Sequence, residues 1–232
     1  YDLDTGFGLV QTLVPLNIDA APLGQSAAVQ AHEPLVMASG GASGVVSLTR
    51  LLSRRPFAGY WEYHIDGALF TSPPRPDHSG AGLFNGRGEL VGVGSLFLGN
   101  AAPSGMPGMP GNMFVPVDLL KPIMTELRAR GSSAASTRAW LGLNCQEQDG
   151  RVSVVRVNED SPAELAGLQR GDRIVAIDGT AVDSLAVLWK TLWSNRQPER
   201  PVSLQIQRDG RDSTVVVHAV DRAKALRRPE GI

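Results

Sequence analysis

One serine lies in a loop whose composition suits nucleophilic chemistry. Ser79 stands between His78 and Gly80, and small residues continue through Ala81 and Gly82. A serine hydroxyl is hardly ionised at neutral pH, so it needs a base within hydrogen-bond reach before it can attack a carbonyl. The candidate bases in the chain are its four histidines, His32, His64, His78 and His218. The alternative for each is an ordinary histidine on the surface or in the core.

The segments around this loop predict an all-β first part. Apolar runs at 7–10, 34–38, 45–48 and 90–98 are separated by Gly, Pro, Ser and Asp, which is typical of short strands joined by turns. Residues 101–111 predict a surface loop, because Pro and Gly recur too closely for a strand or a helix. Apolar residues at helical spacing from Leu119 to Leu127 then predict a helix with Asp118 as its N-cap, ending near Gly131.

A second domain follows a short linker. The stretch 131–137 is small and polar, as in linkers, so we expect domain bounds of 1–130, 138–222 and a tail at 223–232. Strands are predicted at 140–146, 152–157, 173–177, 202–208 and 213–218, with a short helix at 161–168. A second helix carries one apolar face, and Asp209-Gly210 predicts a tight hairpin. The face consists of Leu185, Leu188, Trp189 and Leu192.

This order of elements, with the motif Ser161-Pro162-Ala163-x-x-Ala166-Gly167-Leu168-x-x-Gly171-Asp172-x-Ile174, closely resembles a PDZ domain. The resemblance implies that an extended peptide adds a strand beside a helix and that backbone N–H groups capture its terminal carboxylate. The capturing loop would be residues 140–143, where Gly142 lets the backbone turn. An apolar C-terminal residue would be preferred, and the alternative is that the apolar side chains belong to the core. The pocket would be lined by Leu141, Leu143, Leu188 and Trp189.

The first part resembles the HtrA/Deg family of trypsin-like serine proteases. Ser79, Gly80 and Leu83 match its nucleophile motif, and 65–69 and 113–117 resemble its flanking segments. The resemblance implies that Ser79 is the nucleophile. Asp77 occupies the position of a glycine that helps form the oxyanion hole, and its charge opposes a developing oxyanion. Gly6 occupies the position of the triad aspartate in a strand expected at 2–10, and the segment with the triad histidine is absent from the chain.

Two features near the serine loop have no counterpart in the family motif. The segment 70–76 is longer than the family's equivalent, and either reshapes the cleft or forms a rigid surface turn. An aromatic cluster falls where the family has a variable regulatory loop. Packing within the barrel is the favoured interpretation of this cluster, and a partner contact is the alternative. Its members are Phe57, Tyr60, Trp61 and Tyr63.

Composition argues against several classes of partner and site. The 232 residues include 42% hydrophobic and 19% charged residues with a net charge of -1, which argues against nucleic acid or an anionic membrane surface as the main partner. Cys145 is the single cysteine, so the chain forms no disulfide within itself and no thiolate metal site. No cofactor or metal site is predicted, and no apolar run is long enough to span a bilayer.

Together these patterns predict a mainly β protein. We expect a trypsin-like antiparallel β-barrel, whose first half-barrel is incomplete in this chain, followed by an α+β PDZ domain. Missing strands are expected upstream or from another chain, because an incomplete barrel leaves unpaired edges. By resemblance the function is that of an HtrA-like endopeptidase of protein quality control in the periplasm or cell envelope, binding unfolded or C-terminal peptides. The resemblance also implies a homo-oligomer, specifically a trimer. The alternative is an inactive pseudoprotease that acts as a peptide-binding scaffold.

Overall fold

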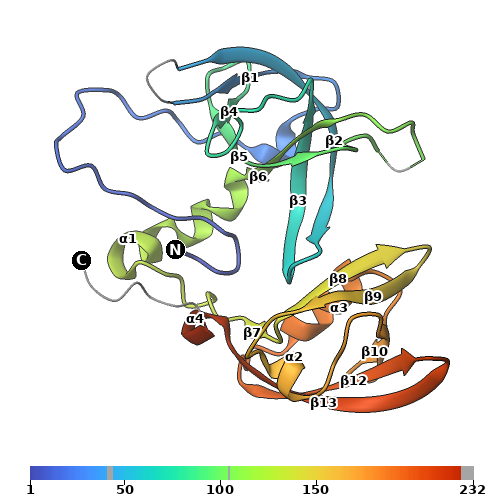
Figure 1. The fold of residues 1–232 in the computed structure, drawn as a ribbon. Coiled ribbons are helices and arrows are strands. Elements are labelled where there is room, and N and C mark those ends of the chain that lie inside the picture. The colour runs from blue at the N-terminus through green and yellow to red at the C-terminus, as the bar shows by residue number, and fades with distance from the viewer. Residues whose placement is uncertain (41–43, 104, 226–232) are drawn as a thin grey trace. The chain divides into compact units, whose positions relative to one another are not determined.

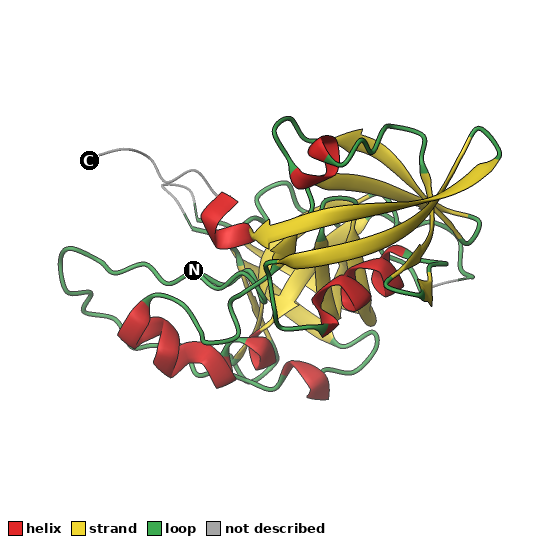
Figure 2. Cartoon of the chain, turned by 90° about the horizontal axis from the view of Figure 1, so that it is seen from below, coloured by secondary structure: helices red, strands yellow, loops and turns green. Residues whose placement is uncertain are grey.

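The structure is a computed structural model that describes residues 1–40, 44–103 and 105–225 (Figure 1). Two compact units are distinguished by their internal contacts. The first comprises Tyr1, Phe7–Pro56 and Ile65–Ser132, and the second comprises Asp2–Gly6, Phe57–His64 and the chain from Ser133 onward. Strands are the dominant secondary structure (Figure 2). The prediction of a mainly β protein is confirmed.

The first unit contains a closed six-stranded barrel in the order β1-β2-β3-β6-β5-β4. Strand β1 closes it by pairing antiparallel with both β2 and β4. The strands are β1 (Pro34–Ala38), β2 (Val46–Gly59), β3 (Tyr63–Ser72), β4 (Gly82–Phe84), β5 (Leu90–Leu98) and β6 (Gly111–Pro116). Alternating residues point inward and form a core that includes Leu35, Met37, Leu51, Leu83 and Phe114, all nearly inaccessible to solvent.

Two predictions for the first unit are wrong in detail. The strand expected at 7–10 does not form, and Val10 and Leu13 are fully exposed outside any strand. The predicted single helix consists of the 3-10 turns η2 (Val117–Leu119) and η3 (Lys121–Ile123) followed by α1 (Met124–Arg130). Pro122 explains the change, because proline lacks the N–H that a continuous helix requires. Asp118 does not cap this helix and instead binds the Ala27 N–H at 2.8 Å. A further short 3-10 turn, η1, spans Ser26–Ala28.

The second unit is an α+β domain around a sheet in the order β7-β13-β12-β10-β9-β8, with β11 paired to β10. Its strands are β7 (Ala139–Trp140), β8 (Leu143–Gln148), β9 (Arg151–Val157), β10 (Arg173–Ile177), β11 (Thr180–Ala181), β12 (Arg200–Arg208) and β13 (Arg211–Asp221). The helices are α2 (Pro162–Leu165), α3 (Leu185–Ser194) and α4 (Arg222–Ala225).

Local sequence signals explain most of this domain. Ser184 caps α3 by accepting the Val187 N–H, and the four predicted apolar residues of α3 are the ones that it buries. Asp209 and Gly210 both have positive φ between the paired residues Arg208 and Arg211, as the predicted hairpin requires. The strand predicted at 140–146 is interrupted after Trp140, because Gly142 adopts φ of 86°.

Residues near the start of the chain are bound within this same unit. Asp2 is buried and accepts a hydrogen bond from the Ser133 hydroxyl, while the Ser136 hydroxyl accepts the Leu3 N–H at 2.7 Å. Arg138 binds the Asp4 carboxylate. The predicted linker therefore holds the segment 2–6 through its serine side chains.

Candidate functional site

Ser79 is exposed in the loop between β3 and β4, and this loop is fixed to β5 by backbone contacts. The Gly80 N–H donates to the Gly94 carbonyl at 2.9 Å, and the Gly94 N–H donates to the Ala81 carbonyl at 2.8 Å. A side chain at Gly94 is excluded, because its Cβ would lie 1.8 Å from the His78 carbonyl oxygen. The glycine at position 94 therefore lets the serine loop approach the strand.

The segment before Ser79 is anchored by a buried amide. Asn112 on β6 accepts the Arg75 N–H at 2.7 Å and donates to the Arg75 carbonyl at 3.1 Å. His78 Nδ1 lies 2.8 Å from the same Arg75 carbonyl, so the ring is held by the backbone of its own loop.

Asp77 brings negative charge into the serine loop. Its half-buried carboxylate accepts a hydrogen bond from the Ser39 hydroxyl at 2.6 Å. That hydroxyl, and then the backbone N–H of Asp77 itself, hold the pKa of the carboxyl below its ordinary value. The Asp77 side chain is therefore ionised at neutral pH and brings a negative charge to the expected oxyanion-loop position.

Gly6 does not lie on a barrel strand. It ends a turn in the second unit, with φ of 77° and its N–H bonded to the Asp2 carbonyl at 2.9 Å. The strand predicted at 2–10 is wrong, because the Asp2 carboxylate binds both the N–H and the hydroxyl of Thr5 and stabilises the turn. Two of the candidate bases, His64 and His218, also belong to the second unit, whereas His32 and His78 belong to the first.

The predicted carboxylate loop holds a carboxylate. Three consecutive N–H groups, those of Leu141, Gly142 and Leu143, converge on the side chain of Glu62. Glu62 Oε1 lies 2.7 Å from the Gly142 nitrogen, 2.9 Å from the Leu143 nitrogen and 3.2 Å from the Leu141 nitrogen. Successive N–H groups of this kind form an anion-binding concavity.

Glycine is required at the centre of this loop. Gly142 has φ of 86°, and a Cβ there would lie 2.2 Å from the Cβ of Ser161. Only a residue without a side chain places all three N–H groups toward one point.

Glu62 is buried, with 2% of its surface exposed. Burial raises the pKa of Glu62 to about 7, while the amide donors of Leu143, Leu141 and Gly142 and the charge of Arg222 favour ionisation and limit the rise. The Arg222 guanidinium is not bonded to the carboxylate but donates to the Glu62 carbonyl at 2.8 Å. Among the described residues, the three amide N–H groups are therefore the hydrogen-bond donors to this carboxylate.

The four predicted pocket residues are all fully buried in the core of the second unit: Leu141, Leu143, Leu188 and Trp189. Trp189 also faces the segment that contains Glu62, because its Nε1 donates to the Gly59 carbonyl at 2.9 Å. The favoured placement of the aromatic cluster within the barrel is wrong, since Phe57–His64 belongs to the second unit. The contact of Glu62 was not predicted; the nearest signal in the sequence was the unusual aromatic density around it.

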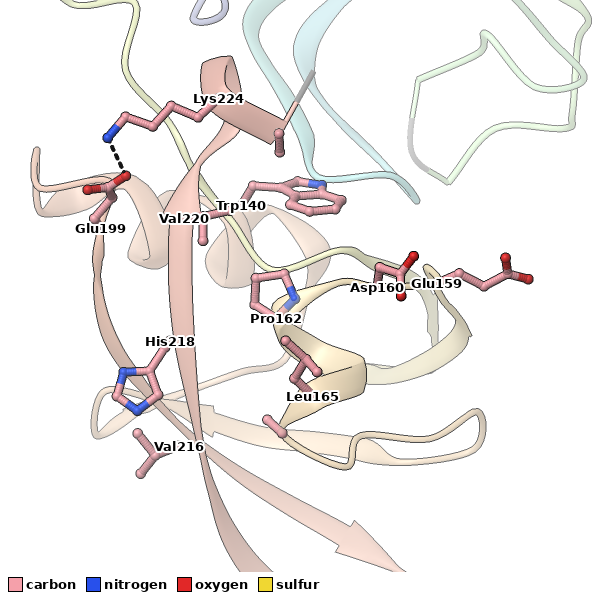
Figure 3. A pocket seen from close by; sticks show the side chains of 12 residues that line it. Trp140, Glu159, Asp160, Pro162, Leu165, Glu199, Val216, His218, Val220 and Lys224 are labelled. Atoms are coloured by element: carbon pink, nitrogen blue, oxygen red, sulfur yellow. Dashed lines mark hydrogen bonds and ion pairs between the residues drawn. The ribbon is translucent and has the colours of Figure 1, made fainter. Parts of the chain in front are cut away.

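A separate pocket of about 760 Å³ lies between α2, β13 and α4 (Figure 3). Its floor is apolar, with Trp140, Pro162 and Leu165, and Glu199 and Lys224 form an ion pair of 2.7 Å at its edge. None of the three N–H donors of the carboxylate loop belongs to a residue that lines it. In the described ranges, no group of three or more His, Cys, Asp or Glu side chains is arranged to hold a metal ion. The described helices include none with the length and apolar character that crossing a bilayer demands.

Comparison with known proteins agrees with both parts of this architecture. The PDZ domain family matches residues 139–218. A probable periplasmic serine endoprotease, DegP-like, from Halomonas elongata is 28% identical over 192 residues, which are 77% of this chain and 37% of the relative. The DegP-like protein of Chlamydia trachomatis is 32% identical over 155 residues, covering 61% of this chain and 29% of the relative. Residues 139–218 therefore form a PDZ domain, and the chain is similar to DegP-like serine endoproteases over most of its length.

Solved structures support the same fold. The HtrA-type protease AlgW with tripeptide aligns with a TM-score of 0.54 at 19% identity, over 90% of this chain and 72% of that one. A serine endoprotease from Yersinia pestis aligns with a TM-score of 0.52 at 18% identity, over 88% and 68%. The chain spans about a third of the length of the curated relatives that it matches.

Proposed function

We propose that the chain is part of an HtrA-like serine endopeptidase whose PDZ domain captures polypeptide C termini. The observation that carries this proposal is the convergence of the Leu141, Gly142 and Leu143 N–H groups on one carboxylate. A loop that binds a side-chain carboxylate through three backbone donors has the chemistry that a terminal carboxylate requires. The peptide would add beside β8, with Leu188 and Trp189 of α3 on its other side.

We further propose Ser79 as the nucleophile. Its exposure and its place in a loop fixed to β5 support this role, as do the names of the relatives, which are called probable periplasmic serine endoproteases. A periplasmic or envelope location and an oligomeric assembly, for which a trimer is the specific expectation, follow from the same relationship.

The test is labelling of the protein, expressed from its complete gene, with a fluorophosphonate probe that reacts with activated serines. Ser79→Ala is the control, because it removes one oxygen atom from an exposed position. Labelling that disappears in the control supports the endopeptidase. Absence of labelling in folded protein refutes it and favours the peptide-binding scaffold, for which the ionised Asp77 at the oxyanion-loop position is the specific argument.

A further inference from the structure

The turn between β2 and β3, residues Gly59–Tyr63, occupies the groove of the PDZ domain in the manner of a peptide. We define these residues as the hairpin tip. They belong to the second unit together with the PDZ domain. Their contacts reproduce, one by one, the interactions expected of an extended ligand with a terminal carboxylate.

The first correspondence is strand addition. Trp61 forms an antiparallel bridge with Asn144 on β8, and the Cys145 N–H donates to the Tyr60 carbonyl at 2.7 Å. The hairpin tip is therefore hydrogen-bonded to the edge of β8 through main-chain groups. Such contacts are those by which a peptide adds a strand to a sheet.

The second correspondence is the contact with helix α3. Trp189 Nε1 donates to the Gly59 carbonyl at 2.9 Å, and Ala58 packs against the PDZ core. A side chain at position 59 would press against the Trp61 ring, since its Cβ would lie 3.1 Å from two ring carbons. The tip therefore lies between β8 and α3, where the resemblance to PDZ domains places a ligand.

The third correspondence is the carboxylate of Glu62, which is held by the three loop N–H groups. A tip that served only to pack would gain nothing from an ionisable side chain in a buried position, because desolvation of a carboxylate is costly. Glu62 also adopts a positive φ of 32°, which is unfavourable for a residue other than glycine. Both costs are offset by contacts with the carboxylate loop.

We propose that the hairpin tip is an internal ligand of the PDZ domain, with the Glu62 side chain in place of a terminal carboxylate, so that a peptide C terminus binds only after the tip leaves. The proposal rests on the proposed function, because it assigns the same groove. Ligand and site lie on one chain, so the effective concentration of the tip is high. The apparent affinity for an external peptide is then reduced by the fraction of molecules in which the groove is open.

The test uses the whole chain and a fluorescein-labelled decapeptide that ends in leucine with a free carboxylate. Binding is measured by anisotropy for the wild type, for Glu62→Ala and for Glu159→Ala, which removes an exposed carboxylate of the same unit. The amide resonance of Gly142 in a ¹⁵N–¹H spectrum reports independently on whether a carboxylate lies in the loop. The amidated decapeptide serves as the ligand control.

We expect Glu62→Ala to bind the free-carboxylate peptide at least about tenfold more tightly than the wild type, because the competing tip then loses its three hydrogen bonds to the loop. Glu159→Ala should bind like the wild type, and the amidated peptide should gain little. The Gly142 resonance should move in Glu62→Ala alone.

Three results overturn the proposal, and they separate it from the proposed function. Equal peptide affinity of the wild type and Glu62→Ala means that the tip does not compete, although peptide capture stands. A Gly142 resonance that is identical in the two proteins means that Glu62 is not in the loop. A resonance that moves while neither protein binds peptide refutes peptide capture itself, and the tip is then a structural contact only.

Discussion

Raising the pH should weaken the contact between the hairpin tip and the PDZ groove. The titrating group is Glu62, whose pKa burial raises from 4.5 to about 7 in the bound tip. A raised pKa means that the bound state holds a proton that the released, solvated side chain gives up. The contact is therefore strongest below pH 4.5 and is lost progressively as the pH rises through about 7.

The size of this effect follows from the two pKa values. Between pH 5 and pH 8 the free energy that favours the bound tip falls by about 2.5 kcal/mol, which is roughly a 70-fold change in the equilibrium between bound and released tip. Other titratable groups near Glu62 do not produce this pH dependence. Burial together with the nearby Glu62 raises the pKa of the Cys145 thiol, which stays neutral over this range. His64 follows Glu62 by two positions on β3 and is retained in the control variant below.

Hydrogen exchange of the Cys145 amide, which donates to the Tyr60 carbonyl, measures this equilibrium directly. After correction for the intrinsic pH dependence of exchange, its protection should fall steeply from pH 5 to pH 8 in the wild type. Glu62→Gln has the same shape without the titrating proton, so its protection should be flat. Protection that is constant or that rises with pH in the wild type would refute the reasoning, because it would show that the three amide donors stabilise the ionised carboxylate at least as much as burial opposes it.

Three further changes have defined outcomes. Gly142→Ala should lower the free energy of unfolding by about 2 kcal/mol or more in urea titrations, since it combines an unfavourable φ with a Cβ 2.2 Å from Ser161. Trp189→Phe keeps an aromatic ring but removes the donor to the Gly59 carbonyl, so Cys145 amide protection should fall about fivefold, the equivalent of about 1 kcal/mol. Asp77→Gly should speed fluorophosphonate labelling of Ser79 by about tenfold or more, because it removes a negative charge from the expected oxyanion-loop position; an unchanged rate would contradict this role of the charge.

Features governed by neighbouring residues were predicted from the sequence. The buried face of α3 follows from residues three and four positions apart, and the turn at Asp209-Gly210 follows from two residues that tolerate positive φ. Strand β10 coincides with the predicted 173–177. In each case the information lies within about ten residues of the chain, so no knowledge of tertiary contacts is needed.

Features governed by distant contacts were missed. The turn at 2–6 depends on Ser133, Ser136 and Arg138, which are more than 130 positions away. The place of Glu62 depends on three N–H groups about 80 positions further along the chain. Backbone N–H groups carry no signature in the sequence, so a loop that binds through them reveals its partner only in the folded chain.

The two candidate sites are joined by a single strand. Glu62 directly precedes β3, and the loop that carries Ser79 begins where β3 ends at Ser72. Binding of a peptide to the PDZ domain would release the tip and so free the start of β3. A change at the start of β3 could then alter the serine loop at its other end. Glu62→Ala should then change the rate of fluorophosphonate labelling of Ser79, although residue 62 carries none of the proposed chemistry. The same rate in the wild type and in Glu62→Ala, with the tip shown to be released by the Gly142 resonance, would mean that β3 does not couple the sites and that the internal ligand regulates peptide capture alone.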